Sequence, residues 1–143
     1  DEHRSYGAKD LSILNSIPNR VIDKTSSDLT LFDRIVDLKY ADFHIGLPSG
    51  LSWLSWAVGT HVHVISGFST TNELFKSGIS KTLPPSKDIC QGCWNSSDFN
   101  WLEKRNDWWV CPEYKDTPRE FECSKSITVE QVINDIKKLI KKK

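Results

Sequence analysis

Four cysteines in the C-terminal third of the chain have the residue type and spacing of a metal site. They follow the pattern Cys90-x2-Cys93-x17-Cys111-x11-Cys123. A CxxC pair presents two thiolates from one tight turn, and two later cysteines can complete a tetrahedral set around one ion. With four protein ligands and no open position, such a site is structural and not catalytic. Ligand type alone makes zinc the first choice and iron the alternative.

Two other kinds of cysteine chemistry stay open. Four cysteines can also form two disulfides, with three possible connectivities, or the CxxC pair can be a redox centre. Redox CxxC motifs open a helix after a strand, whereas Cys90 follows the loop Leu83-Pro84-Pro85. The missing secretory signal weakens the disulfide interpretation, although trimming of the N-terminus could have removed a signal. We expect a cytoplasmic protein. We therefore favour the metal over both alternatives.

The stretch that carries the cysteines is rich in aromatic residues and poor in regular periodicity. Pro112 and Pro118 interrupt it. Such a segment cannot build a core from layers of helix and strand, so a metal and packed rings must hold it together. The aromatic residues are Trp94, Phe99, Trp101, Trp108, Trp109, Tyr114 and Phe121.

The elements that must position this segment alternate between strand and helix patterns. This order predicts a parallel sheet with crossover helices, which is an α/β fold. The expected elements are a strand at Val21-Ile22, a helix from Leu31 to Tyr40, a strand from Phe43 to Leu47, a helix from Leu51 to Val58 and a strand from His61 to Ser66.

A last helix is expected after the cysteines, and Gly59 is expected to end the helix that starts at Leu51. Thr128 is the expected N-cap of the last helix. Its predicted apolar face consists of Val129, Val132, Ile133, Ile136 and Ile140.

The second place where chemistry is expected is the turn between the strand at Phe43–Leu47 and the next helix. Ligands of parallel α/β sheets bind at the carboxyl ends of strands, and the N-terminus of a helix favours an anion such as pyrophosphate. Gly50 lets a ligand approach the backbone, and Ser49 and Ser52 add hydroxyl donors. The same kind of turn joins many strands to helices with no ligand, so this alternative stays open. We interpret His61 and His63 as polar residues of a half-exposed strand.

The composition of the chain argues against nucleic-acid binding and against a membrane span, and it indicates that the chain was processed or belongs to a longer protein. Lys plus Arg and Asp plus Glu both number 19 in the 143 residues, so no net charge indicates a nucleic-acid partner. No stretch reaches the roughly 18 apolar residues that a membrane span needs. The chain contains no Met, so we expect a processed or trimmed product, or a piece of a longer protein.

The motifs taken together resemble the bacterial autotransporter O-heptosyltransferases over roughly residues 18–135. Pro48 departs from the Gly or Ser that is common there in this family. The similar runs are Asp33-Arg34-Ile35-Val36-Asp37-Leu38, Ala41-Asp42-Phe43, the stretch from Ile45-Gly46 to Ala57, Ile65-Ser66-Gly67-Phe68-Ser69, Cys90-Gln91-Gly92-Cys93-Trp94-Asn95, Trp109-Val110-Cys111-Pro112 and Phe121 to Thr128.

The resemblance implies a fold and a donor substrate. The fold would be the C-terminal half of a GT-B glycosyltransferase, with a Rossmann-like donor-binding region (residues 1–82), a four-cysteine metal finger (83–125) and a C-terminal helix packed back on the domain (126–143). Ser49, Gly50, Leu51 and Ser52 would bind the diphosphate of ADP-heptose. In this family the cysteine finger is associated with iron. The resemblance therefore makes iron at least as good a candidate as zinc for the metal bound by the four cysteines.

The resemblance also implies a transfer reaction and a further domain or chain that this reaction needs. Heptose would be transferred to a serine hydroxyl of an acceptor protein without a catalytic divalent metal. The catalytic residues are unknown, because the general base comes mostly from an N-terminal domain or chain, so the isolated chain should be inactive. The alternative is a non-catalytic binding or assembly module that retains the fold and the finger.

Overall fold

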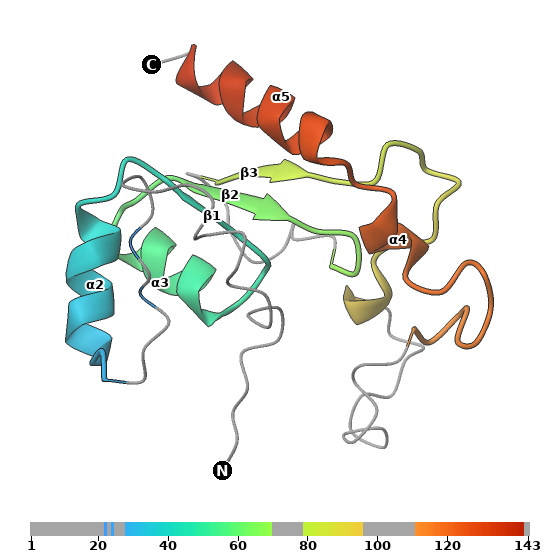
Figure 1. Ribbon diagram of the computed structural model, residues 1–143, viewed down its shortest axis with the longest axis horizontal. Coiled ribbons are helices and arrows are strands. Elements are labelled where there is room, and N and C mark those ends of the chain that lie inside the picture. Colours follow the sequence, from blue (N-terminus) through green and yellow to red (C-terminus); the bar gives the residue numbers. More distant parts are fainter. Residues whose placement is uncertain (1–21, 23, 25–27, 70–78, 96–110, 142–143) are drawn as a thin grey trace. The chain divides into compact units, whose positions relative to one another are not determined.

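A computed structural model of the chain describes residues 22, 24, 28–69, 79–95 and 111–141 (Figure 1). The chain divides into two compact units, Asp1–Arg34 and Ile35–Lys143, and the division falls within helix α2 (Leu31–Lys39). The division into residues 1–82, 83–125 and 126–143 stays a prediction.

The described residues of the first unit begin helix α2 with a reciprocal cap. The Thr30 hydroxyl accepts a hydrogen bond from the Asp33 backbone N–H at 3.2 Å. The Asp33 carboxylate in turn accepts the Thr30 backbone N–H at 2.8 Å, as in a capping box. No strand forms at Ile22, which is 80% exposed, so that expectation is wrong; Val21 lies outside the described residues.

The second unit contains a parallel sheet in the order β1-β2-β3, as the alternating pattern predicts (Figure 1). Its strands are β1 (His44–Gly46), β2 (Val62–Ile65) and β3 (Ile79–Thr82). Both pairings are parallel, with His44 opposite Val62 and Val64 opposite Lys81. Helix α3 (Gly50–Ala57) is the crossover between β1 and β2, and the backbone of Gly59 has φ +83° just after it. This left-handed conformation is the one expected where Gly ends a helix.

The buried centre of the sheet is strand β2. Val62 and Val64 have no exposed surface, as expected for a central parallel strand that is covered on both faces. Helix α3 packs against β1 and β2, and α5 (Val129–Ile140) packs against β3.

His63 lies in this core and not on a half-exposed strand, so our interpretation of this residue is wrong. It is fully buried, with Nδ1 2.7 Å from Ser80 Oγ and Nε2 2.9 Å from Thr82 Oγ1. The Thr82 hydroxyl donates to the Asp135 carboxylate at 2.9 Å, so its oxygen is left to accept the Nε2–H of His63. This chain of hydrogen bonds connects β2, β3 and α5.

Helix α5 begins at the predicted N-cap but buries only part of its predicted apolar face. The Thr128 hydroxyl accepts the Gln131 backbone N–H at 3.2 Å. Val129 is 69% exposed and Ile140 58%. None of the helices in the described part of the chain combines the length and the apolar character that a membrane crossing requires.

The buried position of His63 predicts a pH dependence of stability. Burial lowers the pKa of its imidazole from the usual 6.5, although the nearby Asp135 opposes this shift. The unfolded chain therefore binds a proton at a pH where the folded chain does not, and the free energy of unfolding decreases as the pH falls below about 6.5. Urea unfolding at pH 7.5 and pH 5.5, with NMR titration of the histidine rings, measures both effects. A His63 pKa at or above 6.5 would contradict this prediction.

Candidate functional site

The four cysteines come from three segments of the chain and line one small cavity. Cys93 begins the short helix η1 (Cys93–Asn95), and Cys123 lies in α4 (Glu122–Lys125). All four thiols are free, so the structure contains no disulfide between them. The cavity that they share has a volume of about 10 Å³, which is about the space that one water molecule needs.

The described residues do not form a complete set of metal ligands. In that part of the chain, no three His, Cys, Asp or Glu side chains are placed so that they could hold one ion together. The four-cysteine metal finger therefore stays a prediction. The chemistry of the donors suits a soft ion, because all four cysteines line one cavity and none forms a disulfide.

The thiols are electrostatically unfavourable neighbours when they ionise. The pKa of Cys93 is raised to about 11, first by burial and then by the nearby Cys123, Cys90 and Cys111. The pKa of Cys90 is raised by burial and then by Cys111 and Cys123. A bound cation would reverse this balance, because it stabilises thiolates and displaces their protons.

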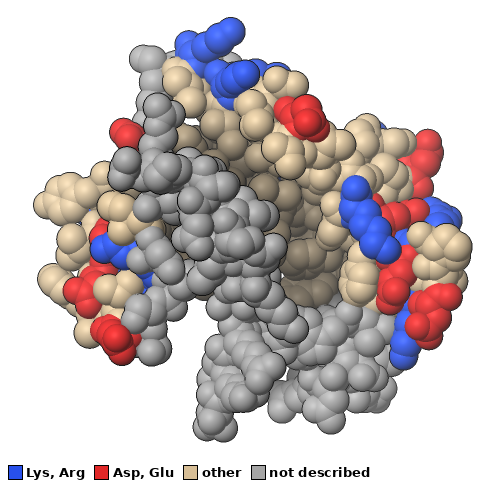
Figure 2. Space-filling view, viewed as in Figure 1, with Lys and Arg blue, Asp and Glu red and all other residues tan. Residues whose placement is uncertain are grey.

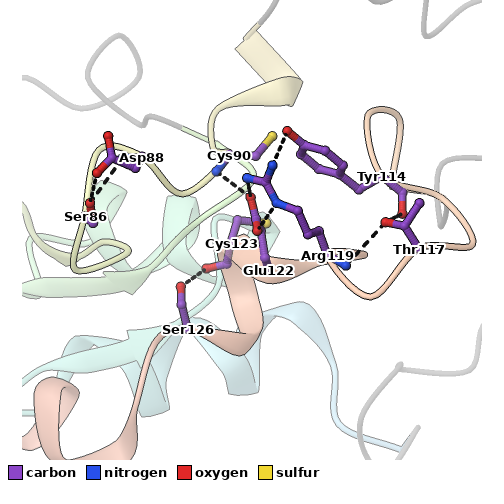
Figure 3. A network of polar contacts seen from close by, with 9 residues as sticks. All are labelled: Ser86, Asp88, Cys90, Tyr114, Thr117, Arg119, Glu122, Cys123 and Ser126. Atoms are coloured by element: carbon purple, nitrogen blue, oxygen red, sulfur yellow. Dashed lines mark hydrogen bonds and ion pairs between the residues drawn. The ribbon is translucent and has the colours of Figure 1, made fainter.

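A network of polar side chains surrounds the cavity, and it centres on Glu122 (Figure 3). The Glu122 carboxylate accepts the backbone N–H of Cys90 at 2.9 Å. Arg119 donates two hydrogen bonds to the same carboxylate, Nε to Oε2 at 2.7 Å and Nη2 to Oε1 at 2.6 Å. Its Nη1 donates to the Tyr114 hydroxyl at 2.8 Å, and the guanidinium lies 4.0 Å from the centre of the Tyr114 ring.

The segment after β2 joins the CxxC turn to the sheet. The Gly67 carbonyl accepts the Gly92 N–H at 2.8 Å, and the Phe68 carbonyl accepts the Trp94 N–H at 2.9 Å. A Cβ atom on Gly67 would lie 2.5 Å from the carbonyl oxygen of Cys123, which is closer than real Cβ contacts. The packing of Gly67 against Cys123 was not predicted from the sequence.

The second candidate site is the turn before α3. Ser49 has extended backbone angles, φ −145° and ψ 176°, and its side chain makes no capping hydrogen bond. A Cβ atom built on Gly50 would meet no atom within 4 Å, so the space beside this residue is open. The first N–H groups of any α-helix lack partners within the helix, so they can face a ligand here.

Ser52 differs from the other residues of this turn because its side chain is fully buried. Its hydroxyl donates to the Leu47 carbonyl at 2.6 Å, and its oxygen lies 3.2 Å from Nε2 of His44. The hydroxyl is therefore not the outward donor that the sequence suggested, and it stabilises the turn instead. Gly46 makes room for the ring, because a Cβ there would lie 2.7 Å from His44 Nε2. Sequence reasoning did not select His44.

The charges near the cysteines are mixed in sign. Figure 2 shows acidic and basic side chains side by side over the region of α4 and the segment before it, and side chains of both signs over α5. The described residues over α4 and the segment before it therefore form no patch of a single sign on this face.

Comparison with known proteins finds heptosyltransferases. The chain is 41% identical over 127 residues to the autotransporter heptosyltransferase TibC of Escherichia coli, which covers 89% of this chain and 30% of TibC. It is 35% identical over 102 residues to the inactive autotransporter heptosyltransferase BimC of Burkholderia thailandensis, covering 71% of this chain and 23% of BimC. No protein-family model matches the chain.

A solved structure gives the same result. It is the crystal structure of dodecameric, iron-containing TibC in complex with ADP-D-β-D-heptose, with a TM-score of 0.71 and 41% identity. The match covers 80% of this chain and 28% of the TibC chain. These findings confirm the resemblance inferred from the motifs, and the chain spans less than a third of the length of the curated relatives it matches.

The contact between Gly67 and Cys123 predicts a difference between two glycine substitutions. Gly67→Ala should lower the free energy of unfolding by about 1–3 kcal/mol, because the new methyl group forces the Cys123 backbone away. Gly50→Ala places its methyl group in open space at the start of a helix, so it should be neutral or slightly stabilising. Urea unfolding of both variants measures the difference, and equal stabilities would contradict the packing described.

Proposed function

We propose, on the premise that this chain is a homologue of the autotransporter heptosyltransferases, that it is the donor-binding part of a glycosyltransferase. The complete enzyme would transfer heptose from ADP-heptose to serine hydroxyls of an acceptor protein of the autotransporter adhesin type. The observation that carries this proposal is the similarity to TibC, in sequence and in fold, with ADP-D-β-D-heptose bound in the TibC crystal structure.

The donor diphosphate would bind at the turn formed by Ser49, Gly50, Leu51 and Ser52. Three features of the structure support this place. The turn follows the carboxyl end of β1, where ligands of parallel sheets bind. The space beside Gly50 is open, and the first backbone N–H groups of α3 favour an anion. Ser52 would contribute its backbone N–H, while its hydroxyl holds the Leu47 carbonyl.

The cysteines would bind one structural metal ion, and iron is preferred over zinc because TibC is described as iron-containing. Cys90, Cys93, Cys111 and Cys123 are the ligands of this proposal, since they line the same cavity. An ion held by four thiolates would tie together three segments that have little regular structure. It has no open position for a substrate, so its role is to shape the domain.

In our proposal, this chain provides neither the general base nor the acceptor site that the transfer reaction needs. The general base and the acceptor site would come from an N-terminal domain or from a separate chain. The chain alone should therefore bind the nucleotide sugar without transferring heptose.

A second function is favoured by one specific observation, which is the similarity to BimC, an inactive member of this group. The chain would then be a non-catalytic binding or assembly module. Nucleotide affinity supports the donor-binding role, whereas a folded chain that ignores ADP but binds another protein supports the module.

The donor proposal predicts nucleotide binding that depends on Gly50. ADP titration of the 143-residue chain should change its tryptophan fluorescence. Gly50→Val should weaken ADP binding about tenfold or more, because the side chain would fill the open space at the helix start. Asn134→Val on the exposed face of α5 is the matched control and should bind ADP normally. A folded chain that binds no ADP at millimolar concentration would refute the donor-binding role.

The metal proposal predicts about one iron or zinc ion per chain in protein purified without chelators. Removal of the ion should lower the melting temperature, because the cysteine segments lose their common ligand. Elemental analysis with thiol titration measures both metal and thiols. A metal-free protein without titratable thiols would indicate disulfides, and one with four free thiols and no metal affinity would refute the site.

A further inference from the structure

We propose that Glu122, fixed by Arg119, is the positioning residue that holds the cysteine segments around their common cavity. The effect that we expect on metal affinity rests on the proposed metal site, whereas the positioning of the Cys90 segment does not. The contacts that carry it are hydrogen bonds between the protein's own residues. We call Glu122, Arg119, Tyr114 and the Cys90 backbone N–H the carboxylate clamp.

The clamp connects segments that are far apart in the sequence. Glu122 precedes Cys123 directly, and its Oε1 accepts the N–H of Cys90, 32 residues away. Glu122 also belongs to the residues that line the cavity of the four thiols. One carboxylate therefore fixes the CxxC turn against the helix that carries Cys123.

Arg119 fixes the orientation of this carboxylate and adds a third segment. Its fork donates to both carboxylate oxygens, at 2.7 and 2.6 Å, which leaves Glu122 a single orientation. Its remaining contacts are with Tyr114, through the hydroxyl at 2.8 Å and the ring face at 4.0 Å. Tyr114 lies three residues after Cys111, so the clamp reaches the segments of three of the four cysteines (Figure 3).

The charge of Arg119 matters as much as its geometry. A lone carboxylate beside four thiols would oppose the formation of thiolates, because like charges repel at short distance. The guanidinium binds both oxygens of this carboxylate and offsets part of its negative charge. A lysine could supply the charge, but it lacks the fork and the stacking on Tyr114.

An ordinary surface ion pair is the simpler alternative, and the chain contains one for comparison. Lys138 and Asp135 on α5 form a pair of the same i,i+3 spacing at 2.8 Å, away from the cysteines. Exposed pairs of this kind contribute little to stability. The Asp135 carboxylate also accepts the Thr82 hydroxyl, so a second hydrogen bond does not by itself distinguish the two pairs. The Arg119–Glu122 pair differs because Arg119 binds both carboxylate oxygens and because Glu122 holds the N–H of Cys90 at the cysteine cavity.

Cys93 is held by different contacts, which provides an internal control. Its neighbours Gly92 and Trp94 donate backbone hydrogen bonds to Gly67 and Phe68. Loss of the carboxylate should therefore release the Cys90 amide and leave the Gly92 amide bonded.

The first measurement is hydrogen exchange of backbone amides in the metal-free 143-residue chain. In Glu122→Ala the Cys90 amide should exchange about tenfold faster than in the wild type, while Gly92 keeps its rate. Glu122→Gln keeps an acceptor oxygen and the shape of the side chain, so its Cys90 amide should exchange at an intermediate rate. An unchanged Cys90 rate in both variants would overturn the clamp, and so would equal acceleration at Cys90 and Gly92.

The second measurement is titration with Co²⁺, whose absorption reports thiolate coordination. Glu122→Ala and Arg119→Gln should each bind Co²⁺ about tenfold more weakly or worse, as for other residues that support metal ligands. Lys138→Gln is the matched control and should bind as the wild type does. Unchanged affinity in both clamp variants would overturn the role of the clamp. If the wild type binds no Co²⁺, the metal site fails, and amide exchange still decides whether the clamp exists.

Discussion

The close packing of Gly67 against Cys123 is the constraint on which the cysteine region depends. The absence of a Cβ lets the segment after β2 touch the backbone of α4, and the carbonyls of Gly67 and Phe68 then bind the CxxC turn. A loop-rich segment is thereby attached to the end of a buried strand. The sheet supplies the rigidity that this segment cannot generate from its own sequence.

Hydrogen bonds between buried polar groups stabilise the sheet itself. The fully buried apolar residues of the described sheet are Val62 and Val64, and His63 lies between them in the same strand. The bonds from His63 to Thr82 and from Thr82 to Asp135 extend from the core to α5. A small core that includes polar groups depends on complete hydrogen bonding, since an unpaired buried group is costly.

The helices and the parallel order of the sheet were predictable because their signals are local. Spacing of apolar residues indicated α2, α3 and α5, and Thr128 and Gly59 marked helix ends by their residue types. Strand β3 was not predicted, because its sequence Ile79-Ser80-Lys81-Thr82 lacks an apolar alternation. Its strand character depends on its pairing with β2, which residues distant in sequence decide.

The sequence alone is enough to identify the chemical groups: four thiols with the spacing of one site, and a Ser-Gly turn at the start of a helix. It could not determine their surroundings. The tertiary structure decided that Glu122 binds the Cys90 amide, that the Ser52 hydroxyl points inward to Leu47, and that His63 is buried. The physical reason is that residue type sets what a side chain can donate or accept, whereas its partner depends on which distant segments the fold brings within about 3 Å.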